Sequence, residues 1–125
     1  MTHLLDVNVL LAAIWRNHPQ HAQASAWLKG KTPAVCPIAE LGFLRISTHR
    51  KAINARMTDA RTALENFLEQ NAIARVPDDL PALKSMAESS EEVTDRYLAD
   101  LAQKHRLKLV TFNVGIKHGS VELIS

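Results

Sequence analysis

An acidic residue interrupts one of the most apolar stretches of this sequence. Asp6 lies in the run "LLDVNVLLAA", with the amide side chain of Asn8 two positions later. A buried charge without a partner costs several kcal/mol, so a carboxylate in this run needs a hydrogen-bonding group or a cation beside it. The rest of the sequence should supply that partner.

Two further acids occupy positions that helical spacing assigns to an apolar face. Glu40, in "CPIAELGFLR", lies three residues before Phe43. Asp95, in "VTDRYLADLAQ", lies three residues before Leu98. Residues three or four apart share one face of a helix, so both acids should point where the apolar residues point. Asp100, five residues after Asp95, should turn toward solvent.

Each acid has an ordinary structural explanation when it is taken alone. Asp6 could cap the following helix, Asp95 could complement a helix dipole, and Glu40 could pair with Arg45 or another arginine. Together, however, gathered carboxylates raise each other's pKa unless a cation lies among them. Mg²⁺ or Mn²⁺ is the natural cation for oxygen ligands. Such ions activate water and stabilise a phosphodiester under attack, with two ions about 4 Å apart in many nucleases.

The elements that must position these acids follow from local patterns. Short apolar runs predict strands at 3–5, 33–36, 73–76, 107–112 and 121–124. Helices are expected at 9–16, from about 22 to Gly30, at 38–48, from an N-cap at Thr58 through 71, at 81–87 and at 94–105.

Strands that alternate with helices predict parallel crossovers and hence a three-layer α/β/α sandwich on a parallel sheet of about five strands. No repeat or linker divides the sequence, so we expect a single domain over residues 1–125. Functional groups of such sheets collect at the carboxyl ends of the strands. Asp6 ends the first strand, and Asn113 follows the strand "LKLVTF".

Composition limits the class of protein. The hydrophobic fraction is 46%, the charged fraction is 22% and the net charge is +2, which predicts an ordinary globular protein that tolerates a nucleic-acid partner. Cys36 is the only cysteine, so neither an internal disulfide nor a cysteine-based zinc site is expected. No segment predicts a membrane span or a signal peptide, and we expect a cytoplasmic protein.

The order of three motifs resembles a known family. "LLDVNVLLA", "CPIAELGFLR" and "VTDRYLADLAQKHRLKLVTFN" together look like a PIN-domain ribonuclease, and within that family like the VapC toxins of bacterial toxin–antitoxin pairs. The likeness covers the whole chain. Its first and third motifs are specific, whereas the second amounts to a Glu early in a helix.

The resemblance assigns roles to individual positions. Asp6, Glu40 and Asp95 match the family's metal-binding acids, Asn8 matches the polar residue after the first acid, and Thr111 matches a supporting hydroxyl. A fourth acid is common just after the last of these strands. This sequence reads "TFNVG" there, so Asn113 replaces a charged ligand by an amide and puts a second metal ion in doubt.

The family resemblance also implies fold and partners. It implies a doubly wound parallel sheet, Mg²⁺ or Mn²⁺ as cofactor, an RNA substrate, a homodimer and an inhibitory antitoxin protein. Trp15 and Trp27, apolar residues of the early helices, would suit a dimer interface. Arg45, Arg50 and Lys51 would contact RNA or an acidic antitoxin segment, or else form a solvated basic connection.

Three other hypotheses fit parts of the sequence. A haloacid-dehalogenase-type phosphatase needs a second carboxylate where Asn8 stands, and a response-regulator receiver domain needs acids that this sequence lacks. A catalytically impaired PIN-like module that binds RNA or protein is supported by Asn113 and opposed by the three acids.

Overall fold

Five short strands form one parallel sheet. The structure is a computed structural model that describes residues 1–125. The strands are β1 (His3–Leu5), β2 (Pro33–Val35), β3 (Ala74–Arg75), β4 (Lys108–Thr111) and β5 (Val121–Leu123). Their order across the sheet is β3-β2-β1-β4-β5, and every pairing is parallel. The chain leaves β1 toward β2 and β3 and then crosses back to β4, so the strand order reverses between β1 and β4, where open α/β sheets bind ligands.

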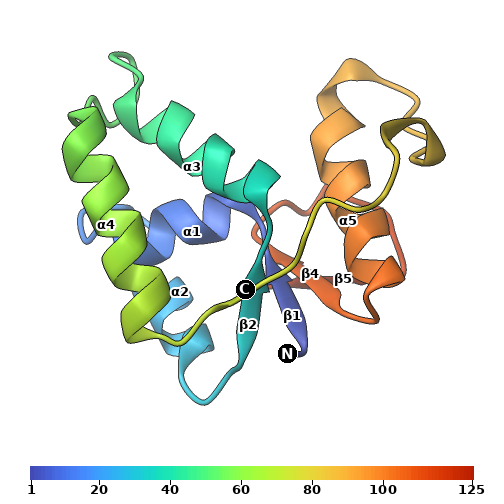
Figure 1. Ribbon diagram of the computed structural model, residues 1–125, viewed down its shortest axis with the longest axis horizontal. Helices are drawn as coiled ribbons and strands as arrows, with labels where there is room; N and C mark the ends of the chain where they lie inside the picture. Colours follow the sequence, from blue (N-terminus) through green and yellow to red (C-terminus); the bar gives the residue numbers. More distant parts are fainter.

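Helices cover both sides of this sheet. They are α1 (Val7–Ile14), α2 (His21–Leu28), α3 (Pro37–Thr48), α4 (Met57–Gln70) and α5 (Val93–Lys104), with short 3₁₀ helices η1 (Ala82–Lys84) and η2 (Ser90–Glu92). α1 to α4 gather on one side of the strands, and α5 with both 3₁₀ helices lies on the other (Figure 1). The predicted three-layer α/β/α sandwich is confirmed.

The central strands are apolar because helices cover both of their faces. Leu4 and Leu5 of β1 and Leu109 and Val110 of β4 are fully buried. A strand that is buried on both faces reads as a continuous apolar run rather than an alternating one, which is why its pattern is so short and plain. The same burial surrounds the first residue after β1.

Three expected elements differ from those observed. Thr58 is not an N-cap, because α4 begins at Met57 and Thr58 lies inside its first turn. The helix expected at 81–87 is reduced to the 3₁₀ helix η1, and η2 was not expected at all. α1 begins at Val7, two residues earlier than the pattern predicts, because Asp6 caps it.

No helix combines the length and the apolar character that crossing a membrane requires.

Candidate functional site

Asp6 lies where β1 passes into α1, and only 3% of it is exposed. Its backbone N–H donates to the Val110 carbonyl at 3.1 Å, which continues the pairing with β4 by one residue. The carboxylate oxygen Oδ1 accepts the Val7 N–H at 2.7 Å, so the side chain caps α1. The capping role considered from the sequence is therefore observed, and it occupies one of the two carboxylate oxygens.

The second oxygen of Asp6 is held by Thr111, at the end of the neighbouring strand β4. The buried Thr111 hydroxyl donates to Asp6 Oδ2 at 2.6 Å. Because its single proton is used there, the same hydroxyl acts as acceptor for Asn8 Nδ2 at 3.3 Å and for the Asn113 backbone N–H at 3.0 Å. One hydroxyl group thus joins three parts of the chain: the end of β4, the first turn of α1 and the β4–β5 connection.

The environment of Asp6 disfavours its charged form. Burial raises the pKa of the Asp6 carboxyl, and the negative charge of Asp95 raises it further. The hydrogen bonds from Thr111 and Val7 oppose this shift without cancelling it. Two carboxylates therefore lie close enough to repel each other, in a buried setting where a cation would be favourable.

Asp95 reaches this region from the opposite side of the sheet. It is half-buried in the first turn of α5. The Asn113 side-chain amide donates from Nδ2 to Asp95 Oδ2 at 2.9 Å, while its oxygen accepts the Gly115 N–H at 2.9 Å. Asn113 therefore holds Asp95 as a hydrogen-bond donor, which an aspartate at this position could not do.

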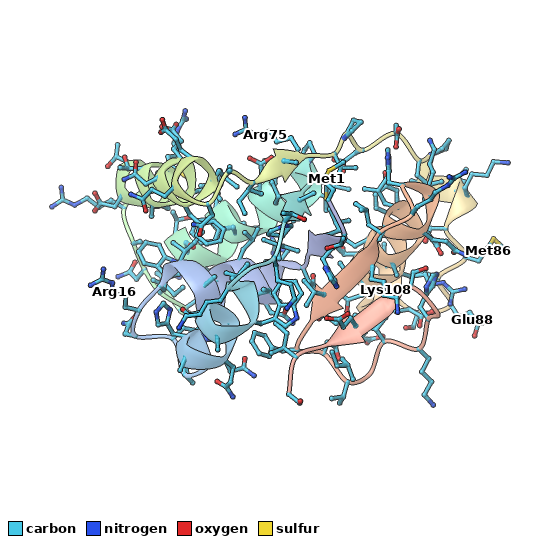
Figure 2. The ribbon with its side chains drawn as sticks, turned by 90° about the horizontal axis from the view of Figure 1, so that it is seen from below. Met1, Arg16, Arg75, Met86, Glu88 and Lys108 are labelled. Carbon is cyan, nitrogen blue, oxygen red and sulfur yellow. The ribbon has the colours of Figure 1, made fainter.

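Glu40 stands apart from the other two acids. It lies in the first turn of α3, and its side chain is 21% exposed. Its closest charged partner is Arg75 at 3.8 Å, an arginine that is 67% exposed and points away from the ribbon beyond β3 (Figure 2). The pairing of Glu40 with an arginine is thus observed, although the partner is Arg75 and not Arg45.

The three acids do not form a closed set of ligands. No group of three or more His, Cys, Asp or Glu side chains is arranged to hold a metal ion. Asp6 and Asp95 fit a divalent cation, because both present carboxylate oxygens and because each oxygen of Asp6 keeps a free lone pair. Asn113 would have to turn its amide oxygen away from Gly115 to become a ligand.

A cleft of about 420 Å³ opens beside Asp95. Its acidic lining includes Glu88, Glu91 and Glu92 from the segment before α5. Asn113 and Lys117 line it from the β4–β5 connection. No expectation from the sequence covered these glutamates, although the acid-rich stretch "ESSEEVTD" that ends at Asp95 was a usable signal.

The basic residues singled out in the sequence lie at the surface. Arg45 is near the end of α3, and Arg50 and Lys51 follow in the next turn. All three are exposed, and none forms an ion pair within the chain. Their charges are therefore available to a partner and equally able to remain solvated.

The expectation for Asp100 was wrong. Its side chain is 20% exposed rather than solvated, and its Oδ1 lies 2.8 Å from His118 Nε2. The five-residue spacing does turn Asp100 away from Asp95, but the β4–β5 connection covers that face of α5.

Comparison with known proteins agrees with this arrangement. The model of the PIN domain family matches residues 3–120. The chain is 34% identical over 126 aligned residues to ribonuclease VapC38 of Mycobacterium tuberculosis. The alignment covers 90% of this chain and 86% of that protein.

Solved structures show the same fold. One is VapBC2 from Rickettsia felis bound to a DNA fragment from its promoter, with a TM-score of 0.65, 18% identity and coverage of 98% of this chain and 97% of that chain. Another is a toxin–antitoxin complex from Klebsiella pneumoniae, with a TM-score of 0.64 and 15% identity. The match covers 99% of this chain and 97% of that chain.

Proposed function

This chain belongs to the PIN domain family and, within it, to the VapC ribonucleases, and we propose that it is a divalent-metal-dependent endoribonuclease that acts as the toxin of a toxin–antitoxin pair. The observation that carries the proposal is Asp6, buried at the reversal of the strand order and held by hydrogen bonds from two elements. The one charged side chain that acts on its pKa is a second acid, Asp95, which raises the pKa further.

In the proposed reaction Asp6 and Asp95 hold Mg²⁺ or Mn²⁺, with Glu40 as a third acid at the same edge of the sheet. A bound ion of this kind supplies Lewis acidity and a more acidic water for attack on phosphorus. Thr111 fixes the orientation of the Asp6 carboxylate, and Asn8 in turn fixes Thr111. Asn113 keeps Asp95 in place through its amide N–H.

The proposed metal dependence is tested by timing the cleavage of a structured RNA with Mn²⁺ and with excess EDTA. We expect cleavage with Mn²⁺ and none in the chelator, because the ion would supply the acidic water and the charge stabilisation on which the proposed reaction depends. Cutting that persists in EDTA would refute the site. The matched control is Asp59→Asn on the exposed start of α4, which should cut as fast as the parent protein.

A second candidate is a PIN domain that binds RNA or protein without cutting. Asn113 favours it, since the amide occupies Asp95 and adds no negative charge. Calorimetric titration with Mn²⁺ separates the two candidates, because an inactive scaffold should bind no metal. Asn113→Asp should tighten Mn²⁺ binding if this position faces the ion.

The proposed partners are an RNA substrate, a cognate antitoxin protein and a second copy of the chain. A relative of the same fold was solved as a toxin–antitoxin complex. The two tryptophans no longer support a dimer: the Trp15 indole donates to Ser47 Oγ at 2.9 Å and Trp27 donates to Glu122 Oε2 at 3.0 Å. The homodimer rests on the family alone, and sedimentation at micromolar concentration tests it.

A further inference from the structure

Two side-chain bridges join the β4–β5 connection to α5, and only one belongs to the site described above. The first runs from Asn113 Nδ2 to Asp95 Oδ2 at 2.9 Å. The second joins His118 Nε2 to Asp100 Oδ1 at 2.8 Å. The connection is thus attached to the same helix at both of its ends.

The two bridges have the same spacing on both segments. Asn113 and His118 are five residues apart, and so are Asp95 and Asp100. Five residues advance about 7.5 Å along a helix, so the bridges are separated by more than one turn of α5. The orange-red connection accordingly passes beside α5 (Figure 1). A contact at His118 therefore limits how far Asn113 can slide along the helix.

Hydrogen bonding fixes the tautomer of His118. Its Nδ1 accepts the Ser120 backbone N–H at 3.0 Å, so in the neutral ring the proton is on Nε2 and is donated to Asp100. The His118 side chain is only 9% exposed. The second oxygen of Asp100 lies 3.8 Å from Arg96 Nε, a weaker contact. Both ring nitrogens are therefore satisfied, and the His118 bridge is better shielded from solvent than the bridge made by the exposed Asn113.

Of the four residues between the bridges, only Ile116 packs against the core. Val114 is 81% exposed, and Gly115 and Lys117 are also exposed. Gly115 and Lys117 line the cleft beside Asp95. Without the His118 bridge, this segment would keep only the packing of Ile116 and the contacts of Asn113.

We propose that His118 and Asp100 are positioning residues: they fix the β4–β5 connection on α5 so that Asn113 stays on Asp95 and Lys117 stays at the cleft. The pair touches neither the proposed ion nor the RNA and acts through Asn113. This role rests on the proposed function, since it concerns the same carboxylate site.

The test compares His118→Ala, His118→Gln and Asp100→Ala with the parent protein. Calorimetry measures the affinity for Mn²⁺ alone, cleavage assays give kcat and KM, and NMR follows the Asn113 side-chain amide and the exchange of the Ser120 amide. We expect His118→Ala to lose about tenfold in Mn²⁺ affinity or kcat, as loss of outer-shell partners does. The Ser120 amide should exchange faster and the Asn113 signal should shift. Gln keeps an N–H that can reach Asp100, so His118→Gln should recover part of each loss.

The matched control is another His–Asp bridge, at the C-terminal end of the same helix. His105 Nε2 lies 2.7 Å from Asp79 Oδ1 just past the end of α5, away from the carboxylate site. His105→Ala should leave Mn²⁺ affinity and cleavage unchanged. Equal losses in His105→Ala and His118→Ala would overturn the inference, because they would report general weakening of the fold.

The proposed function and this inference fail in different ways. If the parent protein neither binds Mn²⁺ nor cuts RNA, the proposed function fails, and an unmoved Asn113 signal in His118→Ala would overturn the positioning as well. If the parent protein is active and His118→Ala matches it in affinity, kcat and Asn113 signal, the inference alone is overturned.

Discussion

Two acids at the same edge of the sheet have opposite surroundings. Asp6 follows β1, is 3% exposed and receives one short hydrogen bond on each oxygen. Glu40 follows β2 within the first turn of α3, is 21% exposed and meets only the mostly exposed side chain of Arg75 at 3.8 Å. Local sequence does not explain this contrast, because both acids lie within a few residues of a buried strand end.

The contrast shows which of the two carboxylates is the more costly to ionise in this fold. Asp6 is held rigidly in a setting that raises the pKa of its carboxyl, so its ionised form is destabilised until a cation arrives. Glu40 is only half-buried, and the Arg75 guanidinium lies 3.8 Å from its carboxylate, so its charge costs the fold less. We therefore expect changes at Asp6 to have larger consequences than changes at Glu40.

The largest expected effect is that of Asp6→Asn. The amide keeps the volume but brings no charge, so metal binding and transition-state stabilisation should both fall. A loss of about 3 kcal/mol corresponds to roughly a hundredfold slower cleavage, at about 1.4 kcal/mol per decade. Timed RNA cleavage and Mn²⁺ titration measure it. Full activity in this variant would end the nuclease hypothesis.

Glu40→Gln should reduce cleavage by about tenfold, less than Asp6→Asn, because the carboxylate is not held in place by the fold. The same assays apply, with Glu65→Gln on the exposed face of α4 as the matched control. If Glu40→Gln proved as damaging as Asp6→Asn, the two acids would act as one ligand set in the metal-bound protein. The expected difference between Asp6 and Glu40 would then be contradicted.

The pH dependence of stability gives a third test, made without metal. The pKa of Asp6 is raised in the folded protein above its ordinary value of 3.8. The folded state therefore binds the proton of the Asp6 carboxyl more tightly than the unfolded state does. This binding stabilises the fold at low pH, and the stabilisation is lost as pH rises from about 3.8 through the folded pKa. Asp6→Asn has no such loss, so its stability relative to the parent protein should grow over that window.

Thermal unfolding of both proteins from pH 3 to pH 7 measures this difference. Asp79 and Glu122, whose pKa values are lowered, act with the opposite sign, but they are present in both proteins and cancel. Mn²⁺ should restore the stability of the parent protein and leave Asp6→Asn unchanged. A pH-independent difference would mean that the Asp6 carboxyl titrates normally.

The smallest effect is expected for Arg75→Gln. The Arg75–Glu40 contact is long and exposed, and such surface pairs contribute about 0–1 kcal/mol. Stability should therefore hardly change, and Mn²⁺ affinity should rise by no more than about twofold because a nearby cation is removed. A marked loss of stability would show that Glu40 is as firmly fixed as Asp6, and the contrast between these two acids would disappear.

Local patterns were sufficient for most elements of the fold. Apolar runs predicted all five strands, and helical spacing predicted all five α-helices. Both patterns are visible in the sequence because burial fixes which residues of a strand or helix must be apolar. The 3₁₀ helix η2 was missed, since three residues are too few to show a period. Asp6 was identifiable for a related reason: a charge inside an apolar run is visible without any structure.

What the sequence determined by itself was the set of elements, the parallel α/β class and the presence of misplaced acids. Which groups surround each acid was decided only by the tertiary structure. Thr111 is 105 residues from Asp6 and reaches it because β4 pairs with β1. His118 reaches Asp100 because the β4–β5 connection folds onto α5. Buried parallel strands are all plain apolar runs, so their sequences do not encode which strand lies beside which, and it is that order which brings Thr111 to Asp6.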